Sequence, residues 1–428
     1  MMFRRIGSPT SENAPSPRTF SARVRWILAA ALLARIAVLV YAQREPQRFD
    51  FPDSHRYAAV AKNIAEGRGP IESPAQRTGT DPLFPLFLAP AWWIPNASVQ
   101  TIFVWSRLLN LLFGLGLVAA VTAMTADCFG PRAATVAGLI AAFDPILLFF
   151  HGLPLTEIVY SSFLWMAILM LTSKQRARRL RTAATAGILL GLSVLARSSG
   201  LPIALAALVV ITAVKLRHAT GSPLQSAAIA ATVLALALLP EAMRHHRLIG
   251  AWSPLRTGSG ATLLESFGPW ADGGPGMEKV AWPAVPPDAN EAQRDRIYRE
   301  AALAWARDHP RESMDLALRK LARTWSVTMN APGYGGTIYR IIGWCTVAPV
   351  YLLALAALLR HGRRRCGILL ILLTPALCVT LMHMVYVGSV RYRVPVMPGV
   401  FILAGAAVAP RDPDSSREPE RLAERTHG

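Results

Sequence analysis

The chain has 428 residues, of which 53% are hydrophobic and only 17% are charged. A soluble protein of this length usually carries about 25% charged residues. The deficit lies in apolar runs, such as 183–214 and 224–239, that are long enough to cross a bilayer as helices. This composition excludes an ordinary soluble domain and predicts an all-α polytopic membrane protein.

The net charge of +19 suggests a nucleic-acid partner at first sight, but its distribution argues against one. Basic residues cluster in short connectors between apolar runs, at 174–181, 215–218 and 360–365. Cytosolic loops of membrane proteins show this enrichment in Lys and Arg. We therefore expect no nucleic-acid binding. The four cysteines have neither CxxC spacing nor a paired framework, so we expect no zinc site and no disulfide scaffold.

Taken in chain order, residues 1–23 are predicted to form a disordered cytosolic tail, and no cleavable signal peptide is evident. Ten membrane spans are predicted to follow. They lie at 24–43, 101–126, 133–150, 155–172, 182–199, 201–214, 224–240, 339–359, 366–387 and 394–409.

If the N-terminus is cytosolic and successive connectors alternate between the two sides of the membrane, all three basic connectors lie inside, together with a cytosolic tail at 410–428. The predicted units are an N-terminal transmembrane module at 24–240 with a first outer loop at 44–100, an extracytosolic domain at 241–338, and C-terminal transmembrane helices at 339–409. We expect both termini in the cytosol of a cell with a bacterial-type plasma (inner) membrane.

The two long outer segments are predicted to contain helices. In the first loop, Asp53 or Ser54 could cap a helix that ends at Gly67 or Gly69. In the second segment, helices are expected at 289–308 and 311–327, with a break before Pro310. The second of these is amphipathic and could rest on lipid headgroups, although the favoured interpretation is that these helices only cover and anchor the site.

Ionisable and polar residues gather at the outer ends of the spans, where an unpaired charge is costly. Arginines at this depth could hold a lipid-linked phosphate, and carboxylates could hold a divalent metal or act as a general base. Arg391 and Arg393 would point the same way in an extended segment. The candidate residues are Asp53, His55, Asp81, His151, Glu157, Arg197, Arg391, Tyr392 and Arg393, with weaker claims for Glu241, His245, His246 and His383.

Several of these residues lie in segments that resemble one known family. The stretch FPDSHRYAAVAKNIAEGRGPIES resembles the first outer loop of polyprenyl-phosphate-sugar-dependent glycosyltransferases of the GT-C fold (glycosyltransferase family 39). These are the bacterial relatives of protein O-mannosyltransferases and of the aminoarabinose transferase that modifies lipid A. The segments DPLFPLFLAP, LTEIVY, ALAWARDHPRESMDLALRKLARTW and RYRVPVMP match in the same order, so the similarity covers most of 24–409.

The resemblance implies an inverting transferase that moves a sugar from a polyprenyl-phosphate donor to an acceptor protein, lipid or glycan. It assigns the general base to Asp53, where many members have two adjacent acids and this chain has Ser54 second. Glu157, Asp81 and His151 are the candidate ligands of a divalent metal, Mg or Mn. The candidate substrate-binding residues are Arg391, Arg393, Arg197, Tyr392 and His55.

Simpler interpretations exist for the main candidates. Asp53 and Glu157 could each favour a helix N-terminus, Asp81 could shape the turn before Pro82, and the arginines could anchor in headgroups. Two other functions also fit a polytopic protein: a transporter or flippase of a lipid-linked substrate, and a non-enzymatic assembly partner. Transporters tend to place polar groups at the midplane of two matching halves, and no such repeat is visible here.

Overall fold

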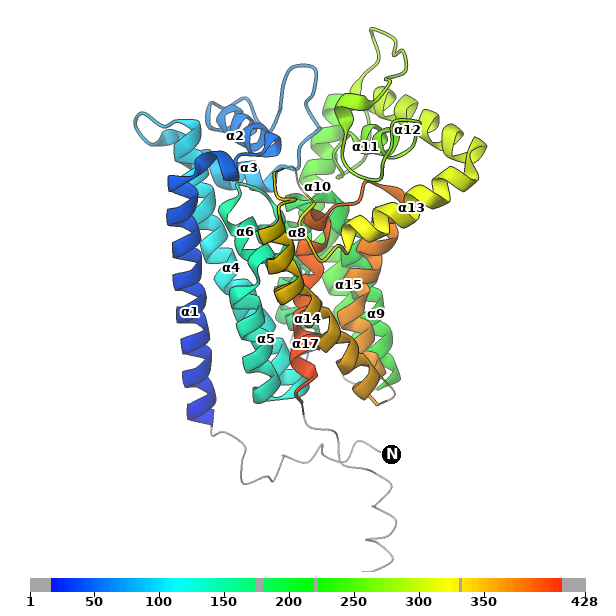
Figure 1. Cartoon of the computed structure of the whole chain (residues 1–428). Helices are drawn as coiled ribbons and strands as arrows, with labels where there is room; N and C mark the ends of the chain where they lie inside the picture. Colours follow the sequence, from blue (N-terminus) through cyan, green and yellow to red (C-terminus); the bar gives the residue numbers. More distant parts are fainter. Residues whose placement is uncertain (1–16, 174–179, 219–221, 331–332, 363, 410–428) are drawn as a thin grey trace, which may run out of the picture.

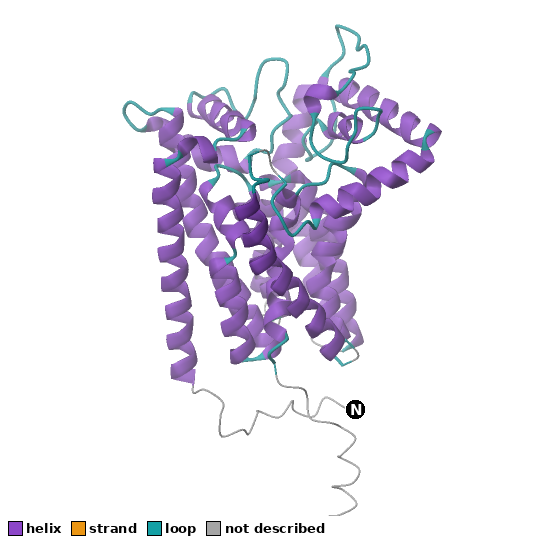
Figure 2. Cartoon of the chain, viewed as in Figure 1, coloured by secondary structure: helices purple, strands orange, loops and turns teal. Residues whose placement is uncertain are grey.

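The computed structural model of the chain describes residues 17–173, 180–218, 222–330, 333–362 and 364–409. Within these ranges every regular element is a helix, and Figure 2 shows helices joined by loops throughout. The predicted all-α polytopic fold is confirmed. Most of the predicted N-terminal tail, the C-terminal tail and most of the basic connector at 174–181 lie outside the described residues.

Six helices are long and apolar enough to cross a membrane on their own. They are α1 (Pro17–Arg44), α4 (Val99–Phe129), α9 (Leu201–Arg217, counted with the turn before it), α10 (Pro223–Ile249), α14 (Thr337–His361) and α15 (Cys366–Val385). The pair α5 (Pro131–Phe143) and α6 (Pro145–Gly152), which bends by 45°, makes a seventh if the two helices are counted as one span. The bend falls at Asp144, whose carboxylate caps α6 by accepting from the N–H of Leu147.

Each remaining predicted span also contains a helix, but a shorter one. These are α7 (Glu157–Thr172, 16 residues), α8 (Leu180–Ala196, 17 residues) and α17 (Met397–Ala406, ten residues), the last preceded by the 3-10 turn η5 (Val394–Val396). All ten residues of α17 are buried, and this helix packs against α5, α14, α4 and α15. The bundle core, rather than lipid, therefore surrounds α17. The turn η3 (Ser198–Gly200) joins α8 to α9.

The two long outer segments gather at one end of the bundle, which we call the capped end (Figure 1). The first contributes η1 (Pro46–Phe49), α2 (Pro52–Ala65), α3 (Leu83–Leu88) and η2 (Ala89–Trp93). The second contributes α11 (Ser259–Ser266), η4 (Met277–Lys279), α12 (Glu291–Asp308) and α13 (Pro310–Thr324). Helix α1 begins at the opposite end of the bundle and finishes at the capped end.

Helices α11, α12 and α13 share a small hydrophobic core of their own, which includes Leu264, Phe267, Ala302 and Leu316. The break between α12 and α13 falls at His309, just before Pro310, as predicted. Helix α11 was not predicted. Its N-terminus is stabilised over a long sequence distance, because the carboxylate of Asp295 accepts from the N–H groups of Gly258 and Gly260.

Candidate active site

A single guanidinium joins two acids from different parts of the capped end. Arg391, on the short helix α16 (Val390–Arg393), donates through Nη1 to Asp53 on α2 at 2.5 Å. Its Nε donates to Oε1 of Glu157, the first residue of α7. Three segments far apart in the chain thus meet at Arg391, and we call the group formed around it the arginine–carboxylate cluster.

Asp53 is free to join this cluster because it does not cap its helix. The predicted cap is wrong: Phe51 occupies the N-cap position of α2, Pro52 follows, and Asp53 lies in the first turn. Its carboxylate also forms a salt bridge with Arg56 at 2.9 Å, one turn further along α2. The side chain stays 29% exposed, so it can be approached from outside the bundle.

Glu157 is the fully buried acid of the cluster. Its Oε1 accepts from Arg391 and, at 2.7 Å, from Arg197 at the end of α8. Its Oε2 has no hydrogen-bond partner among the described residues. A buried carboxylate is costly unless it is paired, and two guanidinium groups offset that cost here.

Tyr392 and Asp81 lie at the edges of the cluster. The guanidinium of Arg197 lies 5.3 Å from the ring centre of Tyr392, which stacks on His383. Asp81 is nearly buried and has Arg256 at 3.8 Å. Burial raises the pKa of Asp81, although nearby Arg256 and hydrogen bonds from Ser198 act in the opposite direction.

The electrostatics of the cluster favour an anionic ligand. Four guanidinium groups surround three carboxylates, and they belong to Arg56, Arg197, Arg256 and Arg391. Burial acts to raise the pKa of Asp53, but Arg391 and Arg56 outweigh it and hold this pKa well below its usual range. Asp53 is therefore ionised at neutral pH. A phosphate could replace the carboxylates as the acceptor for these donors.

Three predicted site residues point elsewhere. The expectation that Arg393 and Arg391 point the same way is wrong, because the segment forms a helical turn instead of an extended strand. Arg393 is fully buried and donates to the carbonyls of Thr324 and Ser326. His55 bonds Asp50 at 2.6 Å near the surface.

His151 is also separate from the cluster. Its ring nitrogens contact the carbonyl of Leu147 and the Nε of Arg35. Both nitrogens are therefore occupied. Within the described ranges no group of three or more His, Cys, Asp or Glu side chains could hold a metal ion. The predicted metal set of Glu157, Asp81 and His151 is not assembled in this arrangement.

Two arginines of the cluster were missed at the sequence level. Arg56 follows Asp53 at i+3 on α2, a spacing that could have indicated their ion pair. Arg256 comes from the loop between α10 and α11 and is brought to Asp81 by the tertiary fold. No local pattern marks it.

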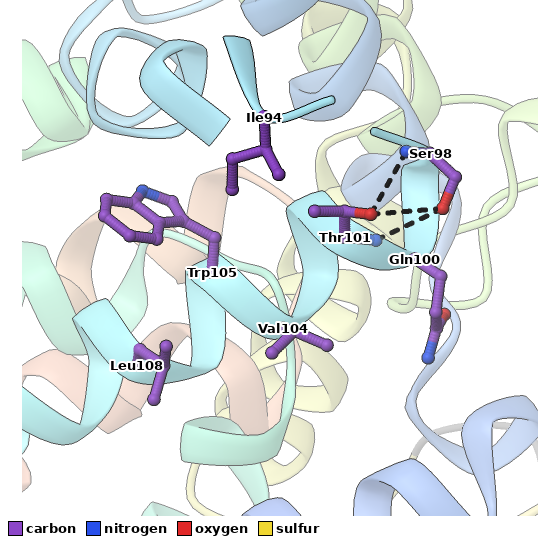
Figure 3. Close-up of a pocket in the computed structure, with 7 residues that line it drawn as sticks. All are labelled: Ile94, Ser98, Gln100, Thr101, Val104, Trp105 and Leu108. Carbon is purple, nitrogen blue, oxygen red and sulfur yellow. Dashed lines mark hydrogen bonds between the residues drawn. The ribbon is translucent and has the colours of Figure 1, made fainter. Parts of the chain in front are cut away.

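A shallow groove also opens at the capped end, on the side of α4. Figure 3 shows its wall, in which Ser98 and Thr101 form the capping box of α4 beneath Ile94. The remaining lining residues are Gln100, Val104, Trp105 and Leu108. None of the cluster residues lines this groove, so it is a separate feature.

Comparison with solved structures identifies the architecture. The oligosaccharyltransferase of Archaeoglobus fulgidus in its apo form matches with a TM-score of 0.55 at 15% identity, over 95% of this chain and 52% of that one. The chain has the GT-C fold. The chain spans about half the length of this structure and of the two described next. No protein-family model and no curated protein sequence matches it.

Two further structures of the archaeal enzyme also share this GT-C fold. One, AglB in complex with an inhibitory peptide and a dolichol-phosphate, matches with a TM-score of 0.52 at 13% identity, over 94% of this chain and 54% of that one. The other, a complex with Zn and sulfate, has a TM-score of 0.51 at 14% identity, over 93% and 50%. The likeness to the GT-C fold agrees with the resemblance carried by the sequence segments.

Proposed function

We propose that this protein is an integral-membrane glycosyltransferase that moves a sugar from a polyprenyl-phosphate carrier to an acceptor at the capped end. The observation that carries the proposal is the bridge that Arg391 makes between Asp53 and Glu157, with Arg197 on the same carboxylate. The GT-C fold supports it, since one similar structure holds a dolichol-phosphate. The finer assignments are an inverting reaction and a sugar that is a hexose or a pentose.

In this proposal the donor phosphate binds Arg391 and Arg197. A phosphate offers more acceptor oxygens than a carboxylate and suits bidentate contacts with guanidinium groups. When Arg391 turns to the phosphate, Asp53 loses its strongest ion pair. The pKa of Asp53 then rises, because burial opposes its charge, and a more basic carboxylate is a better general base.

Asp53 is the group proposed to take the proton from the acceptor. Inversion requires the acceptor to attack the anomeric carbon from the side opposite the departing phosphate, in one displacement. The acceptor's O–H or N–H proton passes to Asp53, a new bond forms to the sugar, and the carrier leaves as polyprenyl phosphate. Because the described carboxylates do not form a metal cluster, no step of this route is assigned to a metal.

The deciding experiment incubates the purified protein with a panel of polyprenyl-phosphate sugars and candidate acceptors, and analyses the products by mass. We expect sugar transfer by the parent protein. In Asp53→Asn we expect transfer to fall at least about 100-fold, the usual contribution of a general base, while the protein still folds. His55→Asn is the matched control, since His55 lies in the same turn of α2 but outside the cluster.

Full activity of Asp53→Asn would exclude Asp53 as the base. Absence of any product with every donor, together with uptake of the lipid-linked substrate into vesicles, would instead favour the transporter. Unchanged turnover after exhaustive chelation would exclude a required divalent metal.

A further inference from the structure

The segment that leads into Arg391 is held from one side by α13. Lys320 donates through Nζ to the carbonyl of Val385 at 2.8 Å, and Arg323 donates to the carbonyl of Gly388 at 3.3 Å. The backbone N–H of Gly388 donates to Gly273 at 2.8 Å. This approach is close, because a Cβ on Gly388 would lie 2.3 Å from the carbonyl oxygen of Lys320.

Asn330 fastens the start of helix α16 itself. Its Oδ1 accepts from the N–H of Val390 at 3.2 Å and from the hydroxyl of Ser389 at 3.4 Å. Its Nδ2 donates to the carbonyl of Arg323 at 2.7 Å. One amide therefore ties the N-cap of the turn that carries Arg391 to the end of α13.

Arg393 fastens the other end of the same turn. It is fully buried and donates to the carbonyls of Thr324 and Ser326, at the point where α13 ends. Carbonyls at a helix C-terminus lack intrahelical partners, so a cationic donor is favourable there. The guanidinium of Arg393 also lies 5.6 Å from the ring centre of Tyr351 on α14.

Two of these cations are costly to bury. Lys320 and Arg393 are fully buried, and within the described part of the chain neither lies within salt-bridge distance of a carboxylate, although Asp144 attracts Arg393 from further away and Lys320 lies 4.0 Å from the ring centre of Phe267. A buried charge without an opposite charge costs free energy, and an apolar side chain of similar size is often the more stable choice. Both cations donate to backbone carbonyls across the contact between α13 and the Arg391 turn. Lys320 reaches from α13 to the segment before the turn, and Arg393 reaches from the turn to the end of α13.

We propose that Arg393 and Asn330 are positioning residues that hold the Arg391 turn against α13, so that Arg391 reaches the donor phosphate. This inference rests on the proposed transferase function. It replaces direct phosphate binding by Arg393 with an indirect role. It also makes the outer unit α11–α13 part of the donor site, since the Arg391 turn is fixed to that unit from both ends.

The test measures initial rates at varied donor concentration, and binding of polyprenyl phosphate alone, for Asn330→Ala and Arg393→Met. We expect the KM for the donor and the dissociation constant of polyprenyl phosphate to rise about tenfold, the factor that one or two hydrogen bonds are worth. We expect kcat at saturating donor to change by less than about twofold. Arg393→Lys keeps a charged donor and should recover part of the lost affinity.

Arg296→Ala is the matched control on α12, because Arg296 is exposed and pairs with Glu300 at the surface. It should match the parent in all three constants. Should Arg393→Met fail to fold, Asn330→Ala keeps the test available, since it removes hydrogen bonds without leaving a charge unpaired.

The outcomes separate the two proposals. A parent protein that neither transfers sugar nor binds polyprenyl phosphate contradicts the transferase function itself. A parent that does both, with donor KM and phosphate affinity unchanged in folded Asn330→Ala and Arg393→Met, overturns only the positioning role.

Discussion

Asp53 lies in a mixed electrostatic environment in which burial and ion pairing act in opposite directions. Its carboxylate is partly covered, yet Arg391 and Arg56 hold its pKa below the usual range, with a smaller contribution from Arg256. A carboxyl group with a depressed pKa contributes stability above its unfolded pKa of about 3.9, and this is lost as the pH falls through the folded value. The ion pairs of Asp53 should therefore persist throughout the neutral and mildly acidic range.

This environment makes a prediction for the acid side of the pH–rate profile. In the parent protein, protonation of Asp53 should not lower kcat/KM for the donor between about pH 5 and pH 7, because this ratio reports the free enzyme, in which Arg391 still pairs with Asp53. Arg56→Gln removes one positive charge beside Asp53 and leaves Arg391 in place. The acid limb should then move to higher pH, because a carboxylate with fewer cationic neighbours protonates more readily.

The control for this profile is Arg296→Gln, which removes one surface charge far from Asp53 in the sequence and should leave the limb where it is. An acid limb that does not move in Arg56→Gln would show that Asp53 does not govern the profile.

At the residue level, the sequence grouped side chains by the end of the span on which they lie. Asp53, Glu157, Arg197 and Arg391 were all expected at one boundary of the membrane, and the structure brings these four into contact. This grouping failed where the direction around a helix mattered. Arg393 lies on the same short helix as Arg391 but points to the end of α13, because the segment is helical.

At the scale of elements, the broken pair α5–α6 depends on a buried cation from α1. Arg35 is almost fully buried and donates to the carbonyls of Ala141 and Ala142 and to Nε2 of His151. The break at Asp144 and Pro145 leaves such carbonyls without helical partners, because proline has no N–H. The guanidinium of Arg35 supplies N–H donors to these carbonyls within the bundle.

We predict that Arg35→Gln lowers the free energy of unfolding in detergent by about 2–4 kcal/mol. Its shorter side chain would leave buried carbonyls unpaired, each at a cost of about 1–3 kcal/mol. Thermal unfolding, monitored through the loss of tryptophan packing, measures this change in the free energy of unfolding. Arg44→Gln, at the exposed end of α1, is the control and should stay within about 0.5 kcal/mol of the parent. An unchanged midpoint for Arg35→Gln would contradict this role.

Elements with a strong local pattern were predictable, whereas those stabilised by distant contacts were not. The bend at Asp144–Pro145 and the break before Pro310 follow from proline chemistry. Helix α11 depends on Asp295, more than thirty residues away, for the partners of its first N–H groups. A search for local periodicity cannot find such a contact.

At the scale of the whole molecule, the two outer segments form one structure across the capped end. The carboxylate of Glu291, at the start of α12, accepts from the N–H groups of Arg77 and Thr78 in the first loop. It also accepts from the hydroxyls of Thr78 and Thr257. Arg244 on α10 holds the same loop by donating to the carbonyl of Arg77 at 2.8 Å. The loop between α2 and Asp81 is thus fixed from two sides.

We predict that Glu291→Ala loosens this loop without unfolding the bundle. Four donors lose their acceptor at once, and the two backbone N–H groups become open to exchange with solvent. Hydrogen exchange at 70–82 should accelerate at least about tenfold, while exchange in α4 and α7 stays as in the parent. Glu300→Ala, on the same helix with one surface partner, is the control and should leave the loop protected. Equal protection of 70–82 in both variants would contradict the role of Glu291 in holding the first loop in place.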